Sequence, residues 1–235
     1  MKKVFLIILL FTTAMASAQD AKLGILKRLT TRVDLFTDIW QIKNDSIKPG
    51  SVNPGISFYI MLDNPMGEGK TPWSYAFGAG ITSENLFNNV FIGYKPNTQN
   101  VNETYFYHIP SKSTAGKVIS YKKNKMVFTF LDIPFELRYR SSKGVKVAVG
   151  GKYGLLMGFH TKYKGDDPNA TKLGFIKRKE TTSTNMQTSR YGATLSVGYK
   201  SILFTGYYQL SKVYKDNVGP DMYPMSVGIT LHPFK

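Results

Sequence analysis

The sequence has no cysteine among its 235 residues. This absence excludes a disulfide scaffold, a thiolate metal site, a cysteine nucleophile and an N-terminal lipidated cysteine. Histidine is also scarce, since the chain has only three, His108, His160 and His232. So few imidazoles leave little for a histidine-built metal centre, and we expect no metal and no other cofactor.

Acidic residues are few, with 15 Asp and Glu against 31 Lys and Arg. In a cytosolic protein this excess of positive charge would favour nucleic-acid binding. The apolar fraction of 42% and the charged fraction of 20% are ordinary, which excludes a disordered chain. The length suits one domain of about 200 to 250 residues, a size that β-barrels commonly reach.

Long apolar runs are absent as well. The run at residues 4–11 is too short to cross a bilayer as a helix, and no other stretch approaches about eighteen apolar residues. Two lysines precede this run, and Ala-Ser-Ala at 16–18 supplies the pattern that signal peptidase requires. We therefore predict a cleaved signal peptide at 1–18 and a single domain at 19–235. Export argues against a nucleic-acid partner.

The rest of the chain alternates with a period of two. In residues 145–164 the odd positions are mostly large and apolar, and the even positions are mostly glycine or lysine. Successive side chains of a strand point to opposite faces, so this pattern predicts a strand with one apolar face. Similar alternation gives eight candidate strands, at 33–39, 56–62, 73–81, 131–139, 145–164, 191–199, 202–210 and 223–231.

The apolar face of these segments indicates contact with lipid. In the last five segments it carries no charged residue. A lysine or arginine facing the middle of a bilayer costs about 2–4 kcal/mol, which explains the exclusion. About ten residues at ~3.3 Å each, tilted by ~40°, cover ~25 Å, the height of an outer-membrane apolar band. Because lipid requires every backbone polar group to be paired, such a sheet must close on itself.

We therefore predict an all-β fold, an eight-stranded antiparallel transmembrane up-and-down β-barrel. Short connections at 63–72, 141–144 and 200–201 are expected on the periplasmic side. The long connections, expected on the outer side, are 41–53, 83–124, 165–187 and 212–221. A secreted soluble barrel of the lipocalin type is an alternative with the same period. The polar faces carry many glycines and charges of both signs, which suits a tight lumen better than a watery exterior.

Aromatic residues lie near the expected edges of the apolar band. Rings with one polar end favour the membrane interface, although strands also favour aromatics in general. We predict an inner girdle of Trp73, Tyr139 and Tyr199 and an outer girdle of Tyr163, Tyr191 and Tyr223.

Several stretches resemble the PorT-like outer-membrane β-barrel family of Gram-negative bacteria. They are WSYAFGAGI at 73–81 with SENL at 83–86, LDIPFELRY at 131–139, GGKYG at 150–154 and VGITL at 227–231. The resemblance covers most of the mature chain, and its motifs are structural rather than chemical. The resemblance implies a small barrel of the cell envelope. The founding member of the family is associated with the type IX protein secretion system.

The inward faces of the expected strands carry ten charged residues, six positive and four negative. They are Arg32, Asp34, Asp38, Asp132, Glu136, Arg138, Arg140, Lys146, Lys152 and Arg190. Eight strands leave an interior that side chains can fill. Because unpaired charges in a low dielectric are costly, we expect a mutually paired plug. A narrow porin or solute channel is the alternative.

Some outer-membrane barrels are enzymes, which need a nucleophile with a histidine and a carboxylate in reach. None of the three histidines has a serine and an acid at a recognisable spacing. The Cα atoms of Asp132 and Glu136 would lie about 13 Å apart on one strand, too far for a shared-proton pair. We expect no enzyme, and an enzyme that modifies envelope lipid remains the alternative.

Basic residues cluster in the long connections. The loop cluster consists of Lys172, Lys177, Arg178 and Lys179. A bacterial outer leaflet carries lipid phosphates, so we predict that this cluster binds a polyanion such as lipopolysaccharide phosphate. A solvated, charged loop is the simpler alternative. The expected partners are outer-membrane lipid and lipopolysaccharide, with secretion-system proteins implied by the resemblance, and we expect a monomer.

Overall fold

The structure is a computed structural model that describes residues 24, 26–43, 47–67, 71–96, 102–169, 174–182 and 184–232. The predicted signal peptide lies outside these residues. The strands are β1 (Leu29–Ile42), β2 (Pro54–Pro65), β3 (Trp73–Phe87), β4 (Val90–Pro96), β5 (Asn102–His108), β6 (Tyr121–Arg140), β7 (Val145–Asp166), β8 (Phe175–Glu180), β9 (Ser189–Tyr199), β10 (Ile202–Gln209) and β11 (Met222–Leu231). No helix in the described ranges is long and apolar enough to cross a membrane.

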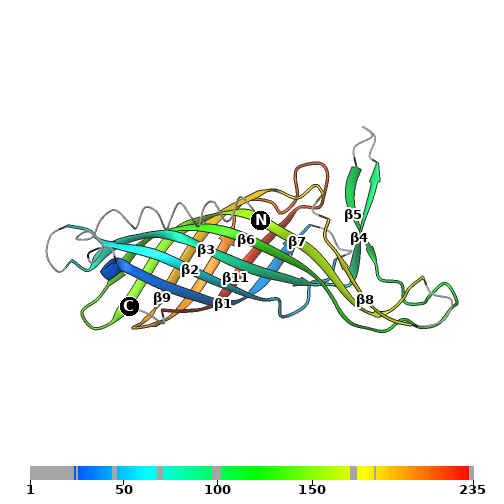
Figure 1. Cartoon of the computed structure of the whole chain (residues 1–235), viewed down its shortest axis with the longest axis horizontal. Coiled ribbons are helices and arrows are strands. Elements are labelled where there is room, and N and C mark those ends of the chain that lie inside the picture. The colour runs from blue at the N-terminus through cyan, green and yellow to red at the C-terminus, as the bar shows by residue number, and fades with distance from the viewer. Residues whose placement is uncertain are drawn as a thin grey trace.

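Eight of these strands form a closed antiparallel barrel, which confirms the predicted fold class. The order around the barrel is β1, β2, β3, β6, β7, β9, β10 and β11, and β11 pairs with β1 to complete the ring. Barrel strands that follow each other in the chain are neighbours, so the topology is up-and-down (Figure 1). Closure pairs the backbone groups around the whole ring and leaves no edge in the wall.

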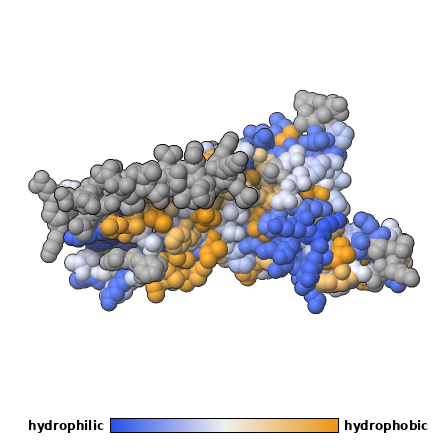
Figure 2. Space-filling view, viewed as in Figure 1, coloured by the Kyte–Doolittle hydropathy of each residue, from blue (hydrophilic) through white to orange (hydrophobic). Residues whose placement is uncertain are grey.

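Alternate side chains of the wall are large, apolar and exposed. Phe135, Leu195 and Phe204 have exposed fractions of 56%, 54% and 74%. Figure 2 shows the resulting apolar surface on the wall. Exposed aliphatic and aromatic side chains at this density identify a surface that meets lipid rather than water.

The predicted inner girdle lies at the end of the barrel with the short turns. Trp73 pairs with Tyr139 across β3 and β6, and their ring centroids are 5.0 Å apart. Tyr199 is exposed at the same end, before the β9–β10 turn. In the predicted outer girdle, Tyr191 is exposed, but Tyr163 is 2% exposed, so its assignment to the lipid-facing wall was wrong.

The reason is a β-bulge in β7. Thr129 of β6 pairs with Gly158, but the next residue of β6, Phe130, pairs with Leu156, so Met157 is an extra residue. A bulge exchanges the two faces of the strand beyond it. The alternation predicted for 145–164 therefore holds only as far as Met157. Past the bulge Phe159 is buried, and His160, predicted on the lumen side, lies on the outer face.

A platform extends beyond the end of the barrel that carries the long connections (Figure 1). It consists of the β4–β5 hairpin and of a three-stranded sheet in which β8 pairs with the far end of β7, beside the far end of β6. The connections 83–124 and 165–187 were predicted as loops and contain these strands. β4, β5 and β8 have six or seven residues each, which is too few to cross the membrane. The prediction considered only strands long enough to cross it, and so these three were missed.

The lumen changes character along its length. Near the platform it is filled by an apolar plug of Trp40, Ile47, Leu86, Val90, Phe106, Met126, Phe128, Phe130, Phe159, Met186, Val213, Tyr214 and Met222. Aromatic rings pack at its centre, with Phe128 centroids 5.4 Å from Trp40 and 5.0 Å from Phe159. The charged interior expected from sequence therefore occupies only the part of the lumen nearer the short turns.

We expect a charge on the lipid face to destabilise the barrel according to its depth. Phe135→Arg, midway along the apolar stretch of β6, should lower the free energy of unfolding by about 2–4 kcal/mol. Tyr139→Arg, at the girdle, should lower it by about 0–1 kcal/mol, because arginine reaches the interface there. Urea unfolding from phospholipid vesicles measures both. Equal losses at the two positions would contradict a lipid-facing wall.

Candidate functional site

The lumen side of the barrel wall holds the candidate site. Eight of the ten predicted charges are buried there, namely Arg32, Asp34, Asp38, Asp132, Glu136, Arg138, Lys152 and Arg190. Arg140 and Lys146 are half-buried at the short-turn end of the lumen. These side chains come from β1, β6, β7 and β9, whose inward positions recur every second residue.

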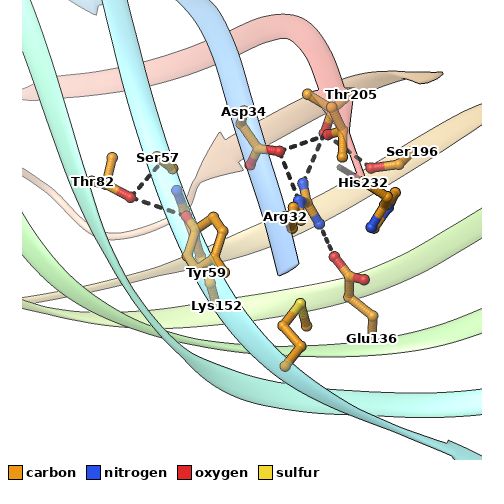
Figure 3. Close-up of polar contacts among 12 residues, drawn as sticks. Arg32, Asp34, Ser57, Tyr59, Thr82, Glu136, Lys152, Ser196, Thr205 and His232 are labelled. Atoms are coloured by element: carbon orange, nitrogen blue, oxygen red, sulfur yellow. Dashed lines mark hydrogen bonds and ion pairs between the residues drawn. The ribbon is translucent and has the colours of Figure 1, made fainter. Parts of the chain in front are cut away.

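The network has a lower part, nearer the short turns, and an upper part, nearer the platform. Arg32 of β1 is the centre of the lower part (Figure 3). Its Nε donates a hydrogen bond to Asp34 Oδ1 at 2.7 Å, and its Nη1 forms an ion pair with Glu136 of β6. Its Nη2 donates to the hydroxyl of Thr205 at 3.2 Å. Asp34 also accepts a hydrogen bond from Thr230 at 2.7 Å, so this guanidinium and its carboxylates are held from three other strands.

Arg138 extends the lower part toward the short turns. Its Nε donates to Glu136 Oε2 at 2.8 Å, and its Nη1 donates to Asp63 Oδ2 at 3.0 Å. Arg140 forms a second ion pair with Asp63. Glu136 and Asp63 thus each hold two guanidinium groups, and arginine suits this role because its planar fork can bind two partners.

Arg190 of β9 is the centre of the upper part. Its Nη2 donates to Asp132 Oδ2 at 2.8 Å, and its Nη1 forms an ion pair with Glu84. Lys152 Nζ lies 3.6 Å from the same carboxylate of Asp132. The guanidinium carbon of Arg190 lies 3.6 Å from the centroid of the Phe130 ring, which belongs to the apolar plug. Arg190 therefore joins the charged network to the plug.

Tyr59 of β2 connects the two parts. Its hydroxyl donates to Asp132 Oδ2 at 3.2 Å, and its ring centroid lies 5.7 Å from the guanidinium carbon of Arg32. The contacts run from Arg140 at the short-turn end to Glu84 under the plug. These side chains form one connected network rather than separate pairs. Asp38 lies outside this network and accepts a hydrogen bond from Ser226 at 2.6 Å.

Sequence reasoning missed Asp63 and Glu84, which are 5% and 1% exposed. With them the inward charges become six positive and six negative, counting the ten predicted residues. Both fall on the inward phase of their strands, but they lie just past the segments predicted as 56–62 and 73–81. Continuing the alternation by a few residues would have found them.

Little empty space remains among these side chains. Two voids of about 30 and 20 Å³ lie beside Arg32 and Glu136, and one of about 10 Å³ lies beside Arg190 and Phe128. A cavity needs a volume of about 10–15 Å³ by this measure to hold one water molecule, so each of these voids has room for only a few waters.

The described histidines form no catalytic constellation. His232 Nδ1 lies 3.3 Å from the Thr31 carbonyl oxygen, and His108 Nδ1 lies 3.1 Å from Asn89 Nδ2. No hydrogen bond joins any described histidine to a carboxylate or to a serine hydroxyl. Across the described ranges, no group of three or more His, Asp or Glu residues is placed to hold a metal ion.

The structure describes three of the four residues of the predicted loop cluster. Lys172 lies outside the described residues, and Lys177 and Lys179 are exposed on one face of β8. Arg178 points to the opposite face, where its guanidinium carbon lies 4.7 Å from the Phe91 ring centroid and its Nε lies 3.3 Å from Glu180. Although neighbouring strand residues face opposite ways, Arg178 lines the same surface hollow as the two lysines. Binding of a polyanion by this cluster stays a prediction.

The model of the outer membrane protein beta-barrel domain family matches residues 39–211. The chain belongs to this family. Membership agrees with the closed barrel and its apolar wall, and the protein is an outer-membrane β-barrel protein. The search of the curated proteins finds no match to this chain.

Solved structures with some similarity include Ail, the attachment invasion locus protein of Yersinia pestis. Its complex with the heparin analogue sucrose octasulfate is 13% identical with a TM-score of 0.34, and another Ail structure is 12% identical with a TM-score of 0.36. Each comparison covers 86% of this chain and 97% of Ail. A mutant porin of Rh. blastica is 7% identical, with a TM-score of 0.22 over 86% of this chain and 98% of the porin.

We expect the upper network to depend on Arg190. Arg190→Met leaves Glu84 and Asp132 without their shared guanidinium and should lower the free energy of unfolding by about 3–5 kcal/mol. The matched control is Arg178→Met, which removes an exposed ion pair of the platform and should cost about 0–1 kcal/mol. Urea unfolding from vesicles measures both. A loss for Arg190→Met no larger than the control's would show that the carboxylates are not held by this arginine.

Proposed function

We propose that this protein is a sealed, non-conducting barrel that serves as a structural component of the cell envelope and anchors the platform outside the cell. One observation carries the proposal: the lumen is filled along its length by the charged network and the apolar plug. An anchor needs a rigid wall and a fixed platform, and it does not need a passage.

The alternative of a narrow porin requires a continuous aqueous path. Channels of this class line such a path with rings of charge or with constrictions that open. Here most of the inward charges of both signs form ion pairs with each other, and the two voids beside Arg32 and Glu136 have volumes of only about 30 and 20 Å³. Opening a path would break several buried ion pairs at once, at a large cost for each.

The proposal includes no catalytic step. The geometry of the described histidines supports this, since none has a carboxylate partner that would orient it as a base. The proposed molecule is a monomer whose partners are outer-membrane lipid and lipopolysaccharide rather than nucleic acid. The apolar wall supports the lipid partner directly.

The finer proposal is an accessory role in protein secretion of the type IX kind. It is supported by the resemblance of residues 73–86 and 131–139 to PorT-like proteins. The β4–β5 hairpin adds a second observation, because Tyr105 and Tyr107 are exposed side by side with ring centroids 5.8 Å apart. Exposed tyrosines are enriched at protein interfaces. Because the lumen is filled, we propose an accessory role rather than that of the conduit.

Planar-bilayer recording tests the sealed lumen. Folded protein inserted into the bilayer should give no steady open-channel current, because the charged network and the plug close the lumen in series. Heat-modifiable gel mobility verifies that the sample is folded, and a porin inserted under the same conditions verifies incorporation. Steady single-channel steps that scale with protein concentration would reject the proposal in favour of the porin alternative.

Deletion of the gene in its own host tests the secretion role. If the role holds, proteins exported by the type IX route should accumulate in the periplasm, and restoring the gene should return them to the medium. Comparative mass spectrometry of the two fractions measures this. A Tyr105→Ala/Tyr107→Ala variant that folds and restores secretion fully would remove the hairpin from the proposal, and unchanged export in the deletion strain would reject secretion itself.

A further inference from the structure

A lysine face lies on the outward side of the sheet that β6, β7 and β8 form beyond the barrel. The name covers six residues, Lys123, Lys125, Lys162, Lys164, Lys177 and Lys179. The cross-strand register arranges them in two rows of three. Lys125, Lys162 and Lys179 form the row nearer the barrel. Lys123, Lys164 and Lys177 form the next row.

These charges are crowded and uncompensated. Neighbouring strands lie about 4.8 Å apart and alternate residues of one strand about 6.6 Å apart, so six side chains start from an area of roughly 10 by 7 Å. Like charges directly opposite each other destabilise a sheet. Within the described part of the chain, no carboxylate lies within 4.0 Å of any ammonium group of the lysine face. Asp166, next along β7, accepts a hydrogen bond from the backbone N of Ser120 at 2.9 Å.

The lysine face surrounds a hollow. Its volume is about 300 Å³, and five of the six lysines line it. Small-ligand sites begin at about this size. Aromatic rings position three of the ammonium groups. Lys123 Nζ and Lys125 Nζ lie 5.7 and 5.4 Å from the Phe87 ring centroid, and Lys164 Nζ lies 5.6 Å from that of Phe175. Attraction to a ring face holds a cation in place without neutralising it.

His160 lies in the positive electrostatic potential of this surface. It lies on the outer face of β7 past the bulge, two residues nearer the barrel than Lys162. Burial lowers the pKa of His160 below its usual value, and the ammonium groups of all three lysines in the nearer row lower it further. A site that disfavours one more positive charge favours a negative one.

The height of the lysine face points to its ligand. On β6 the lipid-facing wall ends near Leu131, and Lys125 lies six residues beyond it on the same face. Six residues span about 20 Å, or about 15 Å along the membrane normal at a tilt of ~40°. A phospholipid head group reaches only about 5–8 Å beyond the acyl chains. Figure 2 shows a hydrophilic patch beside the apolar wall, where Figure 1 places β6, β7 and β8.

We propose that the lysine face binds the phosphate groups on the saccharide head group of outer-leaflet lipopolysaccharide. The face looks sideways, as a continuation of the lipid-contacting wall, so its neighbour is the next lipid molecule. A phosphorylated saccharide is the anionic lipid head group that reaches this height. The inference rests on the proposed function, which places the platform outside the cell.

Titration of the folded protein in detergent with purified, core-phosphorylated lipopolysaccharide tests the proposal. The test variant combines Lys162→Gln, Lys164→Gln, Lys177→Gln and Lys179→Gln. The control variant carries the same charge change at four exposed lysines elsewhere, Lys112, Lys117, Lys143 and Lys215. We expect the test variant to bind on the order of tenfold more weakly at low ionic strength, with a weaker salt dependence, because fewer phosphate contacts form. The control variant should bind as the wild type does.

Two further probes identify the ligand. The same lipopolysaccharide after removal of its phosphates should bind no better to the wild type than to the test variant. Heparin, a sulfated polysaccharide, should bind less tightly than lipopolysaccharide. Equal binding by the test and control variants, undiminished binding of the dephosphorylated lipid, or preference for heparin would each overturn the proposal.

Two controls distinguish a loss of lipopolysaccharide binding from misfolding and from failure of the proposed anchor function. Heat-modifiable mobility reports folding, and Lys177→Gln/Lys179→Gln on β8, which is outside the barrel ring, replaces the test variant if that variant does not fold. This double variant should then bind lipopolysaccharide more weakly than the control, and equal binding would overturn the proposal. Failure of the sealed-anchor function would instead show as open-channel current from wild-type protein, which needs no lipopolysaccharide probe.

Discussion

The closed hydrogen-bonded ring of eight strands is the constraint on which the rest of this structure depends. Lipid offers no partner to a backbone amide or carbonyl, so the pairing of β11 with β1 is required for the wall to exist at all. Once the ring is closed, every strand has one face toward lipid and one toward the lumen. The exposed Phe135 and the buried Glu136, one residue apart, have their roles decided by this geometry alone.

Closure also creates the problem that the interior has to solve. Eight strands enclose a space narrow enough for side chains to fill, with almost no water to solvate a charge. The buried cations are therefore stable only because carboxylates from other strands meet them, as Asp132 and Glu84 meet Arg190. Toward the platform the same space is filled by apolar side chains. The charged network and the apolar plug meet where the guanidinium of Arg190 packs on the Phe130 ring.

The bulge at Met157 separates the barrel from the platform. Below it the outward face of β7 is apolar and meets lipid, and beyond it the outward face carries Lys162 and Lys164. One extra residue thus turns Phe159 inward, where it completes the plug, and turns the lysines outward, where they join those of β6 and β8. The bulge therefore contributes one residue to the plug and two of the six lysines to the lysine face.

The sequence by itself determined the barrel, its strand number, its short turns and most of its inward charges, because a period of two and a fixed wall height leave little freedom in lipid. The partners of those charges came from the tertiary structure, since which strand faces Arg32 or Arg190 across the lumen depends on closure and register. Asp63 and Glu84 joined the network for the same reason. The faces of residues beyond Met157 were decided by a bulge that no periodic pattern contains, because it consists of one residue out of phase. Sequence alternation is a local property, whereas pairing across a closed ring is a property of the whole chain.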